Sequence, residues 1–417
     1  MTPLSAPLPL RTTAVWPGFR EPAPIPHRYG EAGGRLLQYS ADRRVFVWAD
    51  HPVAGVDAVL IGGQAVGNWQ HRNGTDSTGQ AVAFVEFDQP VEEGADLIAR
   101  GRGKLGAGGL MTNPADVLAD ILTTIARRPA IDLSDFRGAC ASAGLEVGGS
   151  LERAETLRAV VRGLCASIGA VFSEGRAFLW PVDAPTGGWR IGGEIDLDAS
   201  LQFDTLANDL TVRFSIEDGQ PRASVRIEAH DSVAAYGRRE RVEDAPWLTS
   251  PRVAIAVATR ALRQRARPAW SVGTGTVDRV LRIGDVVAID HPTLPVQASA
   301  VVLGRELDVQ DSSTRVRFEL PVGDVPTVRL VSQSAALDVQ QYEAIAIETV
   351  GAERVLTLRE ADGRPIVGAS CRLNDNITRL TDGAGRVSFP ASAMPPGVHV
   401  IQVRTEDGRE FATEVTV

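Results

Sequence analysis

The chain has 417 residues, a hydrophobic fraction of 44%, a charged fraction of 23% and a formal net charge of -9 at pH 7. This length exceeds what one hydrophobic core usually supports and the composition is that of ordinary globular domains, so we expect about two to four domains. The acidic balance argues against a protein that holds DNA or a membrane on a basic surface.

No apolar run approaches the roughly 20 residues needed to cross a bilayer. The segment from Met1 to Pro26 lacks the basic-then-apolar layout of a secretory signal. We therefore expect a protein made in a cytoplasm and kept there, or packed into a particle assembled there. Cys140, Cys165 and Cys371 are far apart and lack paired spacing, which predicts small buried side chains.

Proline dominates the start of the chain, with seven prolines between Pro3 and Pro26. Proline has no backbone N–H and a fixed φ, so residues 1–37 are predicted to form an extended arm without a helix or a central strand. Trp16 and Phe19 predict that the arm docks on the rest of the protein, because exposed aromatic side chains are unfavourable in a free tail.

Residues 38–110 are predicted to form a β domain. Strand-like runs cover 44–48, 58–61, 80–87 and 95–99, with a polar loop expected at 72–79. The run 80–87 alternates well enough to predict a strand with one buried face.

The run from Gly101 to Gly106 reads Gly-Arg-Gly-Lys-Leu-Gly and matches the glycine fingerprint of dinucleotide-binding loops. A helix should follow such a loop at once, but the next helix signal comes only at Asn113-Pro114. The chain also lacks the repeated alternation of strands and helices that a dinucleotide fold requires. We therefore predict a mobile glycine loop between two domains and no nucleotide cofactor.

Residues 111–182 are predicted to form a small α+β domain of two helices and a hairpin. The first helix should begin at Asn113 and Pro114, since asparagine suits the capping position and proline the first helical position. A second helix is expected over about 150–168, and a hairpin over 170–180.

Residues 183–325 are predicted to form a second β domain whose strands complete an antiparallel sheet, with a helix over 251–266. The turn at 217–220 contains an Asp-Gly pair, which favours a hairpin. The helix has a narrow face of small apolar residues and several arginines elsewhere. We interpret it as a solvated or subunit-facing helix rather than a phosphate site.

Residues 326–350 are predicted to be a linker, and residues 351–417 a self-contained β-sandwich. Its short strands are separated by Asp-Gly and Pro-Gly turns. The runs 363–369 and 381–385 resemble the sequence pattern of immunoglobulin-like or transthyretin-like modules. This resemblance concerns the fold and says little of function.

No active site, metal site or cofactor is predicted. Asp116 and Asp120 share a helix face, but no third group accompanies them, so they are interpreted as solvated. The six histidines lack ligand spacing. His230, Asp231 and Ser232 carry the residue types of a catalytic triad, but adjacent residues cannot converge on one substrate. We expect Asp231 and Ser232 to bond to local backbone at a corner.

The order of several short motifs is more informative than any one of them. Asn208-x-Leu-x-Val is followed by Ser232-x-x-x-Tyr-Gly-Arg-Arg, an alanine-rich helix and Ile283-Gly-Asp-Val-Val, after a β domain and the helix–hairpin domain. Over residues 40–320 this order resembles the tail-hub or baseplate-hub proteins of tailed phages, gene transfer agents and related tail-like particles.

The resemblance implies a multidomain, mostly β α+β hub in which 38–110 and 183–325 are two tube-like β domains. It implies a homotrimer that adapts a six-fold tail tube to a three-fold tip or fibre. The implied partners are tail-tube and distal tail proteins on one side and a central fibre or spike on the other. DNA would pass through the channel without specific binding. The terminal sandwich lies outside the resemblance and could contact a host surface.

Two other functions remain open. The chain could be a surface protein that binds polysaccharide through the sandwich, which predicts a monomer with affinity for sugar. It could also be a tail-associated cell-wall hydrolase, which requires a cleft with converging acids. The sequence shows no such set of acids.

Overall fold

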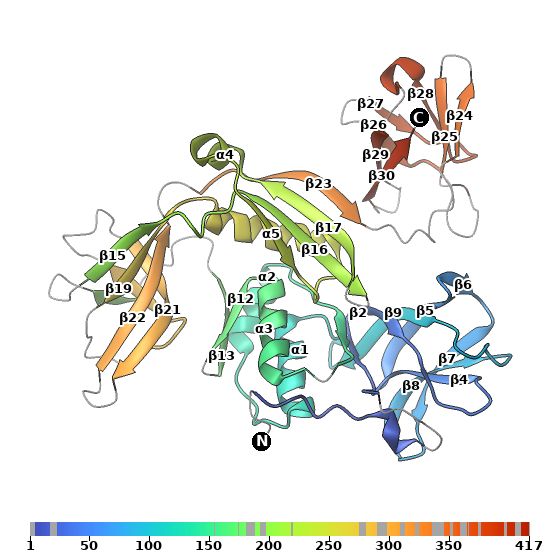
Figure 1. The fold of residues 1–417 in the computed structure, drawn as a ribbon, viewed down its shortest axis with the longest axis horizontal. Helices are drawn as coiled ribbons and strands as arrows, with labels where there is room; N and C mark the ends of the chain where they lie inside the picture. The colour runs from blue at the N-terminus through green and yellow to red at the C-terminus, as the bar shows by residue number, and fades with distance from the viewer. Residues whose placement is uncertain are drawn as a thin grey trace. The chain divides into compact units, whose positions relative to one another are not determined.

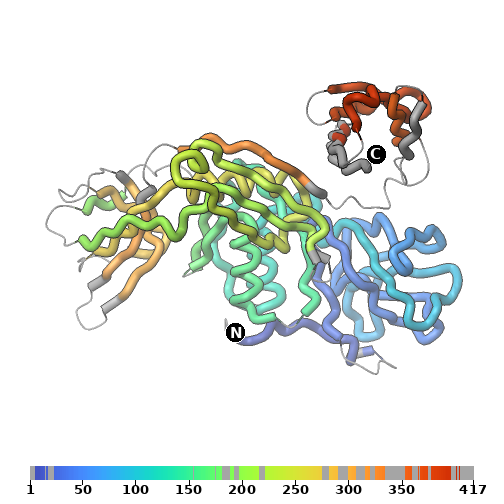
Figure 2. Tube along the Cα trace, turned by 45° about the horizontal axis from the view of Figure 1, so that its top comes forward, coloured from blue at the N-terminus to red at the C-terminus, as the bar shows by residue number. Residues whose placement is uncertain are grey.

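A computed structural model describes residues 5–16, 23–153, 155–173, 175–180, 188–191, 197–217, 220–274, 281–289, 298–308, 313–321, 325–335, 346–350, 353–358, 365, 367–373, 377–395, 398–404 and 410–416. The protein is α+β and mostly β, with several sheets and more than one domain (Figures 1 and 2). Contacts divide it into one compact unit of Met1–Pro221 and Arg226–Val331 and another of Arg222–Val225 and Ser332–Val417.

Two sheets share a core in the first β region. One sheet has the order β10-β9-β5-β6 with β2 also paired to β9, and the other has the order β3-β4-β8-β7. Apolar side chains from both sheets, Trp48 and Val59 among them, form this core. The strands are β2 Glu31–Arg35, β3 Leu37–Gln38, β4 Val45–Ala49, β5 Val53–Ile61, β6 Gln64–Val66, β7 Trp69–Thr75, β8 Ala81–Phe87, β9 Leu97–Gly106 and β10 Gly109–Leu110.

The proline-rich arm docks on this region. Trp16 is buried in a cluster with Ile25, Val47 and Phe84, and its indole N–H donates to Asp76 at 2.9 Å. This confirms the docking predicted from Trp16, whereas Phe19 lies outside the described residues. The arm contains a short 3-10 helix, Thr13–Val15, and β1 His27–Tyr29 and β2 already begin before residue 37.

The glycine run 101–106 is strand, so the predicted mobile loop is wrong. A Cβ on Gly101 would lie 2.4 Å from the carbonyl oxygen of Gly55, and one on Gly103 would lie 2.4 Å from that of Arg28. These two glycines of β9 therefore allow other backbone segments to approach closely, which is a packing role rather than a hinge.

The polar loop expected at 72–79 is confirmed only for 76–79, because β7 extends to Thr75. This strand lies at the edge of its sheet and most of its residues are exposed or only half-buried. Polar residues suit such a position, since an edge strand needs no continuous apolar face.

Three α-helices, a π-helix, a short strand and a hairpin follow, in cyan to green in Figure 1. The elements are α1 Pro114–Asp120, the π-helix η2 Ile121–Ile125, α2 Ser134–Ser142, β11 Gly149–Leu151, α3 Leu157–Ser167, β12 Ala170–Ser173 and β13 Arg176–Leu179. The predicted start at Asn113 is confirmed, since its side chain accepts a hydrogen bond from the N–H of Ala115 at 2.9 Å. The β12–β13 hairpin is confirmed as well.

Helix α2 was not predicted, and the helix predicted over about 150–168 is α3, which starts later than predicted. Residues 149–151 pair with β1 as strand β11, and the hydroxyl of Thr156 then caps α3 by accepting from the N–H of Ala159 at 3.1 Å. Pairing with a distant strand therefore overrides the helical periodicity of the residues that precede Thr156.

The second β region contains a six-stranded sheet of order β14-β20-β21-β22-β19-β15 around an apolar core. Its strands are β14 Trp189–Ile191, β15 Leu197–Gln202, β19 Ala269–Thr274, β20 Val286–Ile289, β21 Ala298–Asp308 and β22 Ser313–Pro321. The sheet is not fully antiparallel as predicted, because β14 pairs with β20 in parallel. Asp218 and Gly219 of the predicted 217–220 turn lie outside the described residues.

A second sheet in this region has the order β18-β16-β17-β23. Its strands are β16 Asp209–Glu217, β17 Gln220–Glu228, β18 Glu240–Asp244 and β23 Arg329–Ala335. Helices α4 His230–Tyr236 and α5 Pro251–Arg265 belong to the same part of the chain. The predicted helix over 251–266 is confirmed as α5, which buries Val253, Ala254, Val257, Ala258 and Leu262 and contacts β16. The corner predicted at Asp231 and Ser232 is wrong: these residues lie in α4.

The second unit contains two sheets of order β24-β25-β28 and β27-β26-β29-β30. The strands are β24 Ala346–Val350, β25 Glu353–Thr357, β26 Ser370–Leu373, β27 Ile377–Leu380, β28 Arg386–Pro390, β29 Val398–Arg404 and β30 Glu410–Thr416. Leu356, Phe389, Cys371 and Ile401 bring the two sheets into one core. Residues 329–335 and 346–350 of the expected linker are strands β23 and β24. Residues 336–345, and part of the 363–369 motif, lie outside the described residues.

Candidate functional site

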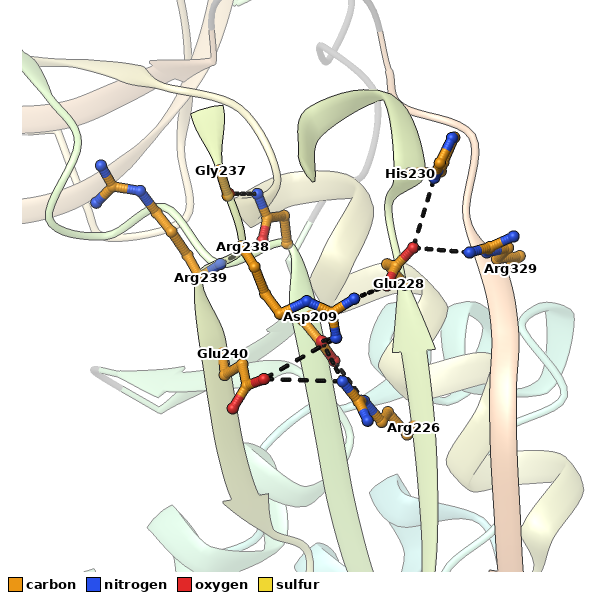
Figure 3. A network of polar contacts seen from close by, with 10 residues as sticks. Asp209, Arg226, Glu228, His230, Gly237, Arg238, Arg239, Glu240 and Arg329 are labelled. Carbon is orange, nitrogen blue, oxygen red and sulfur yellow. Dashed lines mark hydrogen bonds and ion pairs between the residues drawn. The ribbon is translucent and has the colours of Figure 1, made fainter. Parts of the chain in front are cut away.

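The clearest polar assembly in the described structure lies at one end of the β18-β16-β17-β23 sheet (Figure 3). We call Asp209, Arg226, Glu228, Arg238 and Arg329 the Asp209 cluster. Each acid stands at a strand end, Asp209 as the first residue of β16 and Glu228 as the last of β17. The charged groups of neighbouring strands therefore meet at one end of the sheet.

Asp209 is the centre of the cluster. Arg226 donates from Nε to Oδ1 at 2.8 Å and from Nη2 to Oδ2 at 2.6 Å. Arg238 donates to Oδ2 at 2.7 Å. The side chain of Asp209 is only 2% exposed, so both of its oxygens face arginines rather than solvent.

Glu228 repeats the arrangement one strand away. Its Oε2 accepts from Arg238 at 3.0 Å and its Oε1 accepts from Arg329 at 3.0 Å. Its side chain is 4% exposed. Arg238 therefore connects two nearly buried carboxylates, and Arg329 ties the start of β23 to the same group.

The electrostatics of the cluster stabilise the ionised acid. Hydrogen bonds from Arg226 lower the pKa of Asp209 below its usual range, and the positive charges of Arg226 and Arg238 lower it further. The pKa of Arg226 is raised for the same reason. A carboxylate with a lowered pKa and two bound guanidinium groups is a poor proton carrier. The arrangement therefore suits ion pairs that hold neighbouring strands together rather than acid–base catalysis.

A second set of hydrogen bonds surrounds Asn208, which is fully buried. Its Oδ1 accepts from the N–H of Arg239 at 2.7 Å, and its amide N–H donates to Gly237 O at 2.7 Å and to Ser232 Oγ at 3.3 Å. Gly237 has φ 72°, a conformation that side-chain-bearing residues rarely adopt. Asn208 therefore fixes the turn that follows α4.

The triad-like run at 230–232 does not form a catalytic site. The ring of His230 is 66% exposed and its Nδ1 lies 3.6 Å from Glu228. The hydroxyl of Ser232 instead accepts from Asn208, and Asp231 is exposed in the first turn of α4. The three side chains thus have different surroundings.

The two aspartates of α1 are not a bare solvated face, which corrects the prediction. Asp120 accepts from Lys104 Nζ at 2.7 Å, Tyr29 Oη at 2.7 Å and Thr124 Oγ1 at 2.8 Å. Burial acts to raise the pKa of Asp120, but the hydrogen bonds from Lys104 and its neighbours outweigh burial and the pKa is lowered. Asp116 pairs separately with Arg137 at 2.7 Å.

A further buried cluster surrounds Arg28, whose side chain is inaccessible to solvent. Its Nε donates to Trp48 O at 2.7 Å and its Nη1 donates to Glu152 at 2.6 Å, while its backbone N–H donates to His51 Nε2 at 3.0 Å. Burial lowers the pKa of His51 to about 4, and burial beside His51 lowers that of His27 to about 3.

The three cysteines are buried and unpaired, as predicted. Burial raises the pKa of each thiol to about 12, which disfavours the reactive thiolate. No group of three or more potential metal ligands occurs among the described residues. No described helix is long and apolar enough to span a membrane.

Sequence reasoning missed the Asp209 cluster. Asp209 and Arg238 lie within the motif runs, but Arg226 and Arg329 carry no signal, and the Glu228–Arg329 contact joins residues 101 positions apart. Alternation along β17 could have placed Arg226 and Glu228 on one face. The partner from β23 could not have been found without the sheet order.

The chain is similar in structure to several known proteins. The virion of a native gene transfer agent particle gives a TM-score of 0.46 at 14% identity, covering 73% of this chain and 87% of that one. A tail protein from Neisseria meningitidis MC58 gives 0.33 at 14% identity, covering 73% and 94%. The 43 kDa tail protein of prophage MuSo2 from Shewanella oneidensis gives 0.33 at 10%, covering 71% and 93%.

No protein-family model and no curated protein matches the chain. The structural likenesses have TM-scores below 0.5, so they carry no functional assignment by themselves.

Proposed function

We propose that the chain is a structural, non-enzymatic protein of a phage-like tail particle. Three copies form a hub ring at the tail tip or baseplate. The ring adapts a six-fold tail tube to a three-fold tip or fibre and encloses the channel through which DNA passes.

The observation that carries the proposal is the convergence of the motif residues on Asn208. Asn208 opens one run of the hub-like pattern, and Ser232, Gly237 and Arg239 belong to the next. The side chain of Asn208 bonds to all three of these residues. Runs that resemble the hub family in sequence order therefore form one structural unit, which is what a shared scaffold requires.

The chemistry of this unit also favours a scaffold. The nearly buried acids of the Asp209 cluster are neutralised by arginines from β17, β23 and the turn after α4. Such ion pairs fix the relative position of strands but offer no free acid, base or nucleophile. Rigid placement of surfaces is the main requirement of an adaptor ring.

The domain roles follow from the proposal. Residues 38–110 and 183–325 act as the two tube-like domains, so that three copies present six to the tail tube. Tail-tube and distal tail proteins bind one side of the ring and a fibre or spike the other. The Ig-like domain of 351–417 is an appended module that contacts a host surface. The net charge of -9 suits a channel along which DNA slides without sticking.

The first test is the mass of the purified full chain by light scattering, with negative-stain imaging of the same sample. We expect a three-fold ring of three times 44.4 kDa. A chain that stays monomeric, both alone and with the tail-tube protein of its own particle, would remove the basis for the hub and favour the polysaccharide-binding alternative.

A further inference from the structure

An exposed apolar surface lies beside α4. Phe203 and Tyr236 are 40% and 41% exposed, and Leu201 is 39% exposed. The two aromatic rings meet edge to face with their centroids 6.3 Å apart. Large apolar side chains that gather on a surface are typical of sites where another protein binds.

Helix α4 has little packing of its own. Of its seven residues only Ser232 is buried. A helix of this length is unstable without contacts to other elements, and Asn208 bonds to it only at Ser232 and at Gly237, the residue that follows it. Contact with a partner would bury the remaining apolar side chains and stabilise the helix.

Arg239 adds a charge to this surface. Figure 3 shows its side chain pointing away from the Asp209 cluster. Its Nη1 donates to the carbonyl oxygen of Phe203 at 3.2 Å, but within the described part of the chain it forms no ion pair. Arg238, the preceding residue, binds two carboxylates. The guanidinium of Arg239 is therefore available to an acidic partner.

The chain itself presents a complementary surface. The loop between β8 and β9, residues 88–96, contains four acids, no base and an exposed proline, Pro90. Glu93 pairs with Arg43 at 3.2 Å, whereas Asp88 and Glu92 are exposed and make no ion pair to any described residue. The loop thus offers free carboxylates next to a small apolar group.

We propose that Leu201, Phe203, Tyr236 and Arg239 of one copy bind the 88–96 loop of a second copy. The inference rests on the proposed function, because it names the contact that holds the ring together. Two different surfaces make a head-to-tail contact, which closes into a ring when its rotation allows. Pairing of this surface with itself about a two-fold axis would instead place arginine against arginine.

The test is charge reversal in the full chain. Arg239→Glu and Glu92→Lys should each raise the dissociation constant of the ring by about tenfold or more, measured by light scattering on dilution, because each places like charges opposite one another. Phe203→Ser should weaken the ring without changing charge. Arg158→Glu on α3 is the matched control, since Arg158 is exposed and the charge change is the same as in Arg239→Glu.

The decisive variant carries both reversals. Arg239→Glu with Glu92→Lys should return the dissociation constant to within about threefold of the wild type, because the attraction is restored with reversed signs. A wild-type ring that Arg239→Glu, Glu92→Lys and Phe203→Ser leave unchanged overturns this contact and leaves the hub intact. A double reversal that stays as weak as the single variants also overturns it. A wild type that never associates removes both proposals.

Discussion

Asn208 and Arg239 bind each other in both directions. The backbone N–H of Arg239 donates to the side-chain Oδ1 of Asn208 at 2.7 Å. The backbone N–H of Asn208 donates to the backbone carbonyl oxygen of Arg239 at 3.1 Å. The two residues are 31 positions apart, and α4 lies between them. This reciprocal pair closes the loop that presents α4, so it controls the geometry of the surface that we propose as an interface.

Replacing Asn208 should destabilise this region. Asn208→Ala truncates a fully buried side chain, and the backbone N–H of Arg239 and the carbonyl oxygen of Gly237 lose their hydrogen-bond partner. The expected loss in the free energy of unfolding is about 1–3 kcal/mol, measured by urea unfolding. Asn68→Ala, at an exposed position, should change stability by less than about 0.5 kcal/mol. Equal effects of the two substitutions would contradict a stabilising role for the hydrogen bonds of Asn208.

Neutralising Asp209 should also cost stability. Asp209→Asn removes the ionised acceptor of Arg226 and Arg238, with an expected loss of about 1–3 kcal/mol. The low end is favoured because the side chains of these arginines are 34% and 46% exposed and solvent screens part of the attraction. Asp231→Asn, on the exposed side of α4, is the matched control.

The sign of the pH effect follows from the lowered pKa of Asp209. The stabilisation is fully present above the unfolded value of about 3.9 and is lost as pH falls through the lower folded value. The difference in stability between wild type and Asp209→Asn should therefore shrink in acid. A difference that stays constant between neutral and strongly acidic pH would argue against an ionised Asp209.

The local parts of the fold could be predicted from sequence, and the non-local parts could not. Helix α5 and the start of α1 follow from periodicity and capping, and the β12–β13 hairpin from a short apolar pattern around a turn. The glycines of β9 look like a loop because the requirement for glycine comes from Gly55 and Arg28, which pack against them from distant positions.

The candidate site was even less predictable. The motif runs contain Asp209 and Arg238, but the sequence predicts a corner at Asp231 and Ser232, where the structure has helix α4. The helix depends on tertiary contacts, since Asn208 and Ser232 meet only in the folded chain. The ion pairs depend on the order of strands, because β23 places Arg329 next to β17. Neither relationship is encoded in local spacing.

Acid should destabilise the first β region through its buried histidines. Burial lowers the pKa of His27 to about 3 and of His51 to about 4, against about 6.5 in an unfolded chain. Between these values the unfolded state binds more protons, so stability falls as pH decreases below about 6.5, by up to about 1.4 kcal/mol per pH unit for each histidine.

The measurement is the free energy of unfolding from pH 7.5 to 4.5 for the wild type and His27→Gln. The variant should show a shallower decline, because one of the two buried groups no longer titrates. His230→Gln provides the control, since its ring is 66% exposed. Identical slopes for the wild type and His27→Gln would show that His27 is not held neutral by burial.

The close approach at Gly101 predicts a large effect of a single methyl group. In Gly101→Ala the new Cβ would lie 2.4 Å from Gly55 O and 2.8 Å from Val56 Cα. Both are backbone atoms, so β5 or β9 must move, and we expect the free energy of unfolding to fall by about 2 kcal/mol or more.

Gly138→Ala is the matched control within α2, where a Cβ meets nothing within 4 Å. It should stabilise the protein by about 0.5–1 kcal/mol, because alanine favours a helix. Thermal unfolding of both variants decides the question: a Gly101→Ala protein as stable as the wild type would mean that the run 101–106 is a flexible loop after all.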